Sequence, residues 1–312
     1  MNARAVQAEG LVKRFGGETA LDGLSFSVEP GEIFGFIGPD GAGKTTLFRI
    51  LTTLLLADQG SARVLGLDVV RDFWDLRARI GYMPGRFSLY PDLTVGENLS
   101  FFAAVFGTSP EDQEDLIGPI YGQIERFRDR RAGALSGGMK QKLALSCALV
   151  HRPEILFLDE PTTGVDAVSR REFWDLLARL REQGLTIVVS TPYMDEASRC
   201  DRVALVQDGR SLGVDAPDAF GARYGHPLVA VRGEDRRHLP ELLRSWEHAL
   251  SAYPFGETVH VTDRRSGVDP TRVADQVRDY LNARGAGRVD VQPIEPGIED
   301  VFIALMGAGE AS

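Results

Sequence analysis

A glycine-rich segment near the amino end of the chain carries residue types that could bind phosphate. Glycine lets several backbone N–H groups converge on phosphate oxygens, because no Cβ stands in the way. A helix predicted to begin at Lys44 adds its positive amino end. We expect Lys44 to reach the β- and γ-phosphates of a nucleotide and the Thr45 hydroxyl to bind Mg²⁺. The residues expected to contact the nucleotide here are Gly38, Pro39, Asp40, Gly41, Ala42, Gly43, Lys44, Thr45 and Thr46.

Two adjacent carboxylates follow an apolar run farther along the chain. The run Ile155 to Leu158 is typical of a buried strand, and Asp159 and Glu160 come directly after it. Beside a phosphate loop, we expect Asp159 to bind Mg²⁺ directly or through a neighbour and Glu160 to polarise an attacking water. The alternative is an ordinary helix-cap pair, which the phosphate loop disfavours.

A third motif lies between these two. Its residues are Leu135, Ser136, Gly137, Gly138 and Met139. Ser136 is predicted to cap a helix from Gly137 to Val150, which would direct backbone N–H groups and a positive helix end outward. In this order and spacing, the three motifs resemble the ATP-binding subunit of ABC transporters, over about Val6 to Gly221.

The resemblance implies that the nucleotide is ATP, bound with Mg²⁺. It places Phe15 where an aromatic ring stacks on adenine. It also implies a head-to-tail pair of ATPase subunits, in which the Leu135–Met139 motif faces the γ-phosphate held by the other subunit. Asp166 matches the loop along that dimer seam. Two ATP molecules then hold the pair together, and hydrolysis releases it. A membrane permease would be another polypeptide.

Two positions depart from the family pattern. Gly85 stands where the family usually has a glutamine that touches Mg²⁺ and the attacking water, and Pro192 stands where a histidine contacts the γ-phosphate. Neither residue offers a side-chain donor or ligand. Together with Asp40, where many relatives have asparagine, these departures resemble the first of two unequal ATPase halves in ABC-2-type multidrug exporters. The alternative is a homodimer that tolerates both substitutions.

The elements that must position these residues alternate along the chain. Apolar runs at Ile33–Ile37, Ile155–Leu158, Thr186–Ser190 and Val203–Val206 predict central parallel strands, separated by helices such as Ser169–Gln183. A helix from Lys44 to about Leu55 follows the phosphate loop. The predicted fold is α/β, a P-loop NTPase (RecA-like) core. It carries an antiparallel β edge of two or three strands within Ala5–Glu29.

A helical subdomain is predicted at about 84–150, inserted into the ATPase domain 1–221. Thr94 and Glu97 form a capping-box pattern before the apolar run Leu99–Phe106, and Ser109-Pro110 is predicted to open another helix. We expect part of the segment Arg86–Tyr90 and of the run Leu99–Phe106 to form a groove for a permease helix. The alternative is that Phe101, Phe102 and Phe106 all belong to the core, and we expect most of them to do so.

The last part of the chain, 222–312, predicts a small α+β domain of ferredoxin-like type. It resembles the C-terminal extension of exporter ATPases that work with ABC-2-type permeases. His226, His238, His248 and His260 show no metal-ligand spacing. The expected strands are Leu228–Arg232, Glu257–Thr262 and Val289–Ile294, and the expected helices are Leu239–Leu250, Thr271–Arg284 and Ile298–Met306.

The composition limits the kinds of partner and the cellular location that can be expected. The 35 Lys and Arg residues against 45 Asp and Glu residues give a net charge of −10, which argues against nucleic acid as a partner. The first ten residues have no apolar core typical of a signal peptide. Cys147 and Cys200 are expected to be buried and unpaired. We expect a cytoplasmic protein, and the family resemblance implies that it works at the inner face of the cell membrane and drives drug or xenobiotic efflux. Two alternatives remain open, a nucleotide-gated regulatory module with little ATPase activity and a soluble ABC protein.

Overall fold

A computed structural model of the chain describes residues 4–86, 88–235 and 237–309. Phe87, which belongs to the segment expected to line a permease groove, lies outside the described residues. Contacts divide the chain into two compact units, Met1–Ala216 and Pro217–Ser312. The division falls after Ala216 rather than after Gly221, because helix α7 (Pro217–Ala222) packs with the second unit's helix α10 (Ile298–Gly309).

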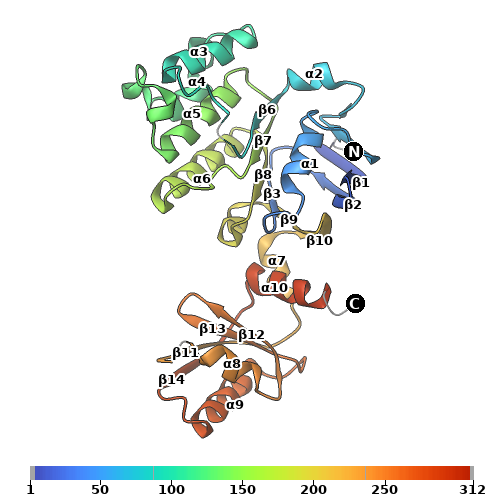
Figure 1. The fold of residues 1–312 in the computed structure, drawn as a ribbon, viewed down its shortest axis with the longest axis vertical. Helices are drawn as coiled ribbons and strands as arrows, with labels where there is room; N and C mark the ends of the chain where they lie inside the picture. Colours follow the sequence, from blue (N-terminus) through green and yellow to red (C-terminus); the bar gives the residue numbers. More distant parts are fainter. Residues whose placement is uncertain (1–3, 87, 236, 310–312) are drawn as a thin grey trace. The chain divides into compact units, whose positions relative to one another are not determined.

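The first unit is built on a six-stranded sheet with the strand order β10-β9-β3-β8-β7-β6 (Figure 1). The neighbours from β9 to β6 pair in parallel, and only the edge strand β10 is antiparallel. The carboxyl ends of β3, β8, β7 and β6 therefore meet at one edge of the sheet. The strands are β3 (Ile33–Ile37), β6 (Ile80–Met83), β7 (Ile155–Asp159), β8 (Thr186–Thr191), β9 (Arg202–Gln207) and β10 (Arg210–Asp215).

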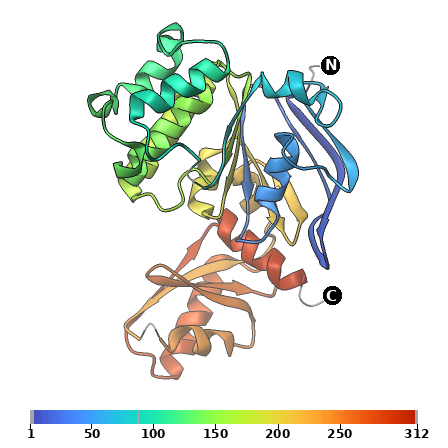
Figure 2. The same cartoon turned by 45° about the horizontal axis from the view of Figure 1, so that its top comes forward.

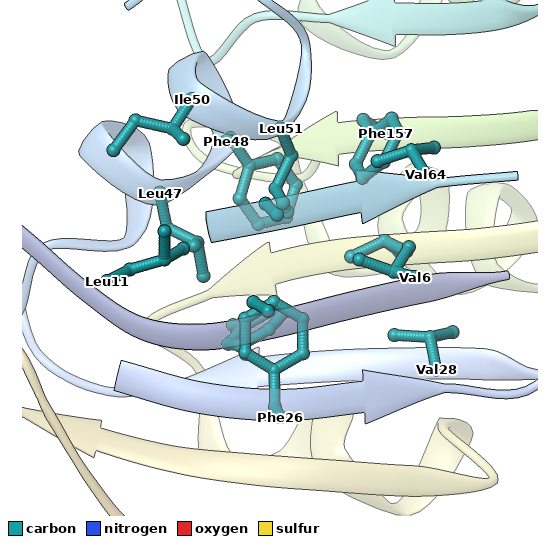
Figure 3. Close-up of a cluster of buried hydrophobic side chains, with 14 of the residues drawn as sticks. Val6, Leu11, Phe26, Val28, Leu47, Phe48, Ile50, Leu51, Val64 and Phe157 are labelled. Atoms are coloured by element: carbon teal, nitrogen blue, oxygen red, sulfur yellow. The ribbon is translucent and has the colours of Figure 1, made fainter. Parts of the chain in front are cut away.

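A second, antiparallel sheet has the order β2-β1-β4-β5. The predicted antiparallel edge is confirmed as two strands, whereas β4 and β5 are additional. Helix α1 (Lys44–Leu51) places Leu47, Phe48 and Leu51 in the same apolar cluster as side chains of both sheets (Figure 3). The strands are β1 (Val6–Phe15), β2 (Glu18–Val28), β4 (Gln59–Val64) and β5 (Leu67–Asp68).

Helix α1 ends earlier than its predicted limit at Leu55. Thr53 adopts a left-handed backbone with φ 65°, and the Thr52 hydroxyl donates to the carbonyl of Phe48. A right-handed helix requires a φ of about −63°, so the helix cannot continue through Thr53.

A group of helices between β6 and β7 forms the predicted helical subdomain, coloured green in Figures 1 and 2. The capping box is confirmed, because the Thr94 side chain accepts from the Glu97 backbone and the Glu97 side chain accepts from the Thr94 backbone. The segment after Pro110 opens as a 3-10 turn (Glu111–Gln113) before the α-helix. The α-helices of this group are α3 (Val95–Val105), α4 (Glu114–Tyr121) and α5 (Gly137–Leu149), whereas α2 (Phe73–Arg77) precedes β6 and α6 (Ala167–Glu182) follows β7. Short 3-10 turns also lie at Glu125–Phe127, Ala132–Ala134 and Met194–Arg199.

The second unit contains a βαββαβ arrangement with the sheet order β12-β13-β11-β14, which is the ferredoxin-like topology. All three neighbouring pairs are antiparallel. The elements are β11 (Leu228–Gly233), α8 (Leu239–Arg244), β12 (Ala249–Phe255), β13 (Thr258–Asp263), α9 (Pro270–Ala283) and β14 (Val289–Ile294).

The predicted helix Leu239–Leu250 is wrong in its second half. Helix α8 ends at Arg244, and the chain from Ala249 pairs with β13 as strand β12. Ala249 and Ala252 face the core while Leu250 is 51% exposed. Pairing with β13 decides the structure of this segment, because an amphipathic pattern over a few residues fits a helix or a strand equally well.

Candidate functional site

The loop between β3 and α1 has the backbone shape that the glycines predict. Gly41 and Gly43 have φ values of 85° and 95°, which L side chains rarely adopt. A Cβ on Gly43 would lie 2.2 Å from the carbonyl oxygen of Ala20, and one on Gly38 would lie 2.1 Å from that of Val206. The loop therefore requires glycine at these positions. Its backbone N–H groups and the amino end of α1 are suited to bind a phosphate group.

Lys44 begins α1 and turns its side chain back over this loop. The ammonium group is buried and donates to the carbonyl oxygens of Gly38 and Pro39 at 2.8 and 2.9 Å. It also lies 3.3 Å from a carboxylate oxygen of Glu160. A buried cation held among oxygen acceptors at the mouth of the loop is suited to bind phosphate oxygens.

Asp159 and Glu160 lie at the carboxyl end of β7, next to the loop. Asp159 is 1% exposed and accepts from the Ser190 hydroxyl at 2.6 Å. The backbone N–H of Glu160 donates to the Ser190 carbonyl at 3.0 Å, and Glu160 has an unusual φ of 50°. The helix-cap alternative is wrong, since the next α-helix begins only at Ala167, after Asp166.

Ser190 was not predicted as a site residue. Its hydroxyl and carbonyl hold both members of the acidic pair, and it lies on β8, which is parallel to β7. The strained backbone at Glu160 is held by these bonds and directs its side chain toward Lys44. A serine at the end of an apolar strand is the only sequence signal for this role.

Both departures from the family pattern lie at the same edge of the sheet. A Cβ on Gly85 would lie 3.0 Å from the Asp159 carbonyl oxygen and 3.7 Å from Cβ of Glu160. Pro192 follows Thr191, whose carbonyl accepts from the Gly38 N–H at 3.4 Å. Residues 85 and 192 therefore adjoin the acidic pair and the phosphate loop, and neither contributes a polar side chain.

Phe15 ends β1 and is 49% exposed, with the Lys13 ammonium group 5.6 Å from the ring centre. The ring is not part of the core, so it is accessible for stacking, as its predicted role requires.

The Leu135–Met139 motif and the segment around Asp166 lie together. Ser136 caps α5 as predicted, with its hydroxyl accepting from the Met139 N–H at 3.4 Å. A Cβ on Gly138 would lie 2.6 Å from the Ser169 hydroxyl oxygen. Asp166 caps α6 by accepting from the N–H groups of Val168 and Ser169, and the bond from Ser169 lowers the pKa of the Asp166 carboxyl. Asp166 thus has a local structural role besides its predicted place on a dimer seam.

An apolar groove of about 430 Å³ lies between the core sheet and the helical subdomain. Leu89, Phe102 and Phe106 line it, which agrees with the position predicted from the Arg86–Tyr90 and Leu99–Phe106 segments. Phe101 and Phe106 are 41% and 39% exposed, so the expectation that most of the three phenylalanines belong to the core is wrong. The His151 ring forms part of the lining and stacks on Phe106 at 3.8 Å between ring centres. The lining residues are Thr52, Leu54, Arg77, Ile80, Tyr82, Met83, Ser88, Leu89, Phe102, Val105, Phe106, Ala144, Cys147, Ala148 and His151.

Known proteins share these features. A family model described as ABC transporter matches residues 21–163. The Nod factor export ATP-binding protein I of Burkholderia thailandensis is 36% identical over 313 residues, which cover 98% of both chains. The chain belongs to the ABC transporter family. Its ATP-binding domain is of the kind that hydrolyses ATP in this family.

Another relative of this ABC protein is longer. The probable multidrug ABC transporter ATP-binding protein YbhF of Escherichia coli is 43% identical over 318 residues, which cover 100% of this chain and 54% of that protein. The chain therefore spans about half the length of this relative.

Solved ABC structures confirm the fold of the ATPase core. CbiO1 of Clostridium perfringens, part of the cbiONQ transporter complex, has a TM-score of 0.63 and 28% identity, covering 70% of this chain and 91% of that one. An ATP-binding cassette solved as a dimer in a post-hydrolysis state with ADP and Pi has a TM-score of 0.61 and 26% identity, covering 68% and 98%. Among the described residues, no helix has the length and apolar character needed to cross a membrane.

Proposed function

We propose that this chain is the ATP-binding subunit of an ABC-2-type exporter and that its own site hydrolyses ATP slowly. It works at the inner face of the cell membrane with a second, non-identical ATPase subunit and with ABC-2-type permease chains. The relatives named for multidrug transport and Nod factor export support an exporter of drugs or other small organic molecules.

One observation carries the proposal of an impaired site. Gly85 adjoins the acidic pair and Pro192 adjoins the phosphate loop, and neither can donate or ligate through a side chain. Removing one positioned polar contact to a transition state typically slows a reaction by about a hundred- to thousandfold. Lys44, the phosphate loop and the Ser136 cap are intact, so the chain can bind ATP and complete the site of a partner.

The residues present would fit ATP and Mg²⁺. Phe15 offers a ring for the base, the 38–46 segment offers N–H groups and a cation for the phosphates, and Thr45 with Asp159 would hold the metal. Bound Mg²⁺ would neutralise phosphate charge. Glu160 is the residue placed to orient and polarise a water, and Ser190 fixes its backbone.

The groove lined by Leu89, Val105 and Phe106 is the proposed docking surface for a permease helix. It joins the sheet that carries the nucleotide residues to the helices that carry Ser136, so an apolar helix bound there would contact both parts. Its lining is mostly aliphatic and aromatic, which suits the apolar face of an amphipathic helix.

Restoring the missing residues tests the impaired site. We expect the purified chain to hydrolyse ATP slowly and the Gly85→Gln, Pro192→His double variant to hydrolyse it about a hundredfold faster or more. Equal turnover by parent and double variant, with ATP bound equally well, would contradict the proposal. If the unmodified chain hydrolyses ATP when mixed with its neighbouring ATPase but not alone, unequal pairing is supported. If no pairing hydrolyses ATP, a regulatory module is favoured.

A further inference from the structure

Glu196 is a buried carboxylate that none of the roles above uses. It is 3% exposed and lies in the 3-10 turn Met194–Arg199 that follows β8. One carboxylate oxygen accepts from the Thr162 hydroxyl at 2.8 Å, and the other accepts from the Thr191 hydroxyl at 2.6 Å. Both donors are themselves buried, so water does not replace either bond.

The direction of these bonds is fixed by the neighbours. The Thr191 hydroxyl oxygen accepts from the backbone N–H of Tyr193 at 3.1 Å, so its own hydrogen is directed to Glu196. The Arg170 guanidinium lies 3.8 Å from Glu196 and over the Tyr193 ring at 4.7 Å. A buried carboxylate is costly unless it is paired and hydrogen-bonded, and these groups provide both.

Glu196 thereby joins two segments that adjoin the nucleotide site from different sides. Thr191 accepts through its carbonyl from the Gly38 N–H, at the start of the phosphate loop. Thr162 lies two residues after Glu160. Arg170 belongs to α6, whose first turn is capped by Asp166, and Gly164 of the same segment lies against Gly137.

We propose that Glu196 is a positioning residue through which the phosphate loop and the segment Thr162–Asp166 respond as one unit to nucleotide. The carboxylate is the shared acceptor, so losing either hydroxyl removes this link between the two segments while leaving Lys44 and the loop backbone in place. This role needs only ATP binding to the phosphate loop, and it holds whether or not the two ATPase sites of a pair are unequal.

Hydrogen exchange on the full chain, with and without Mg-ATP, tests this role. In the parent we expect Mg-ATP to slow exchange both in residues 38–46 and in residues 162–169. In Thr191→Val, which keeps the volume and removes the donor, the loop should still respond. The added protection of 162–169 should fall by roughly fivefold or more, the size of one net hydrogen bond.

Two control variants separate positioning from a general loss of stability. Thr186→Val removes a buried hydroxyl at the opposite end of the same strand, where it accepts from the Gly31 N–H at 2.9 Å. In this variant Mg-ATP should still slow hydrogen exchange both in residues 38–46 and in residues 162–169. Thr191→Ser restores the hydroxyl and should behave as the parent.

The role is overturned if residues 162–169 respond to Mg-ATP in Thr191→Val as they do in the parent, or if they do not respond in the parent. Should Thr191→Val fail to fold, Thr162→Val cuts the other bond to Glu196, and the same split between loop and segment is expected there.

Discussion

A carboxylate oxygen of Glu160 lies 3.3 Å from the ammonium group of Lys44. The two residues come from different strand ends, Lys44 after β3 and Glu160 after β7, and β8 lies between those strands. Ser190 on β8 holds the Glu160 backbone, so the intervening strand sets this contact. The residue expected to bind phosphate and the residue expected to polarise water therefore share one small volume.

The first prediction concerns this cation. Lys44→Ala should weaken Mg-ATP binding by roughly a hundredfold, because hydrogen bonds to charged groups contribute about 1.5–3 kcal/mol. Isothermal titration calorimetry would measure the change. Lys142→Ala is the control, since Lys142 pairs with Glu172 on the helices instead. Unchanged affinity in Lys44→Ala would exclude this loop as the nucleotide site.

The glycines of the loop allow a second, matched comparison. Gly41→Ala meets no atom within 4 Å and should cost about 1–2 kcal/mol for the left-handed backbone alone. Gly43→Ala has the same backbone cost and would also place its Cβ 2.2 Å from the Ala20 carbonyl oxygen. Its free energy of unfolding should fall further, as urea denaturation would measure. If the free energy of unfolding falls equally in the two variants, the backbone around Gly43 and Ala20 moves apart at no cost, and the predicted clash is absent.

The sequence predicted the elements whose signals are local. The Thr94–Glu97 capping box, the Ser136 cap and the glycine loop each depend on residues a few positions apart, and all three lie where they were expected. The sequence did not predict β12, because the Ala249–Phe255 segment becomes a strand only through its pairing with β13.

Contacts between distant segments also escaped prediction. Thr162 and Glu196 are 34 residues apart, and Asp159 and Ser190 are 31 apart. Their partnership depends on the parallel order β7-β8, which no periodicity specifies. The sequence shows that Gly85 and Pro192 depart from the family pattern, but only the sheet places them beside Asp159 and Gly38.

A third prediction is a pH dependence that arises at His151. Burial lowers the pKa of His151, although a bond of 2.9 Å from its Nε2 to the Ile80 carbonyl opposes this shift. The unfolded chain therefore binds the proton more readily, and the folded protein loses stability as the pH falls below about 6.5, the ordinary histidine value. His151→Gln lacks this titration, so the free energy of unfolding of the parent relative to that of the variant should fall from pH 7.5 to pH 5. If the free energies of unfolding of the two proteins change in parallel with pH, the pKa of His151 is not lowered in the folded protein.

The groove provides a fourth prediction. Val105 lines it and is 62% exposed, so Val105→Glu should place a charge on the docking surface without disturbing the core. We expect less permease to co-purify with the variant and Mg-ATP binding to be unchanged. Leu89, which belongs to the predicted segment Arg86–Tyr90, is 5% exposed, so a charge there would lower stability as well as docking. Val70→Glu is the control, as Val70 is 53% exposed and does not line the groove. Equal co-purification of both variants would remove the groove as the permease site.

The last prediction concerns the unequal pair. In the assembled complex, Ser136→Arg should reduce ATP hydrolysis by about a hundred- to thousandfold, because the α5 amino end serves the partner's nucleotide. Glu160→Gln should reduce it much less. The nucleotide site that contains Glu160 already lacks polar side chains at positions 85 and 192, and catalytic effects within one site are grossly non-additive. Glu154→Gln is the matched control, since Glu154 stands just before β7 and pairs with Arg79 on the surface. The comparison needs both ATPase subunits, because the isolated chain forms only sites with both departures. If Glu160→Gln silences the complex as fully as Ser136→Arg does, this chain's own site turns over ATP and the pair is not unequal.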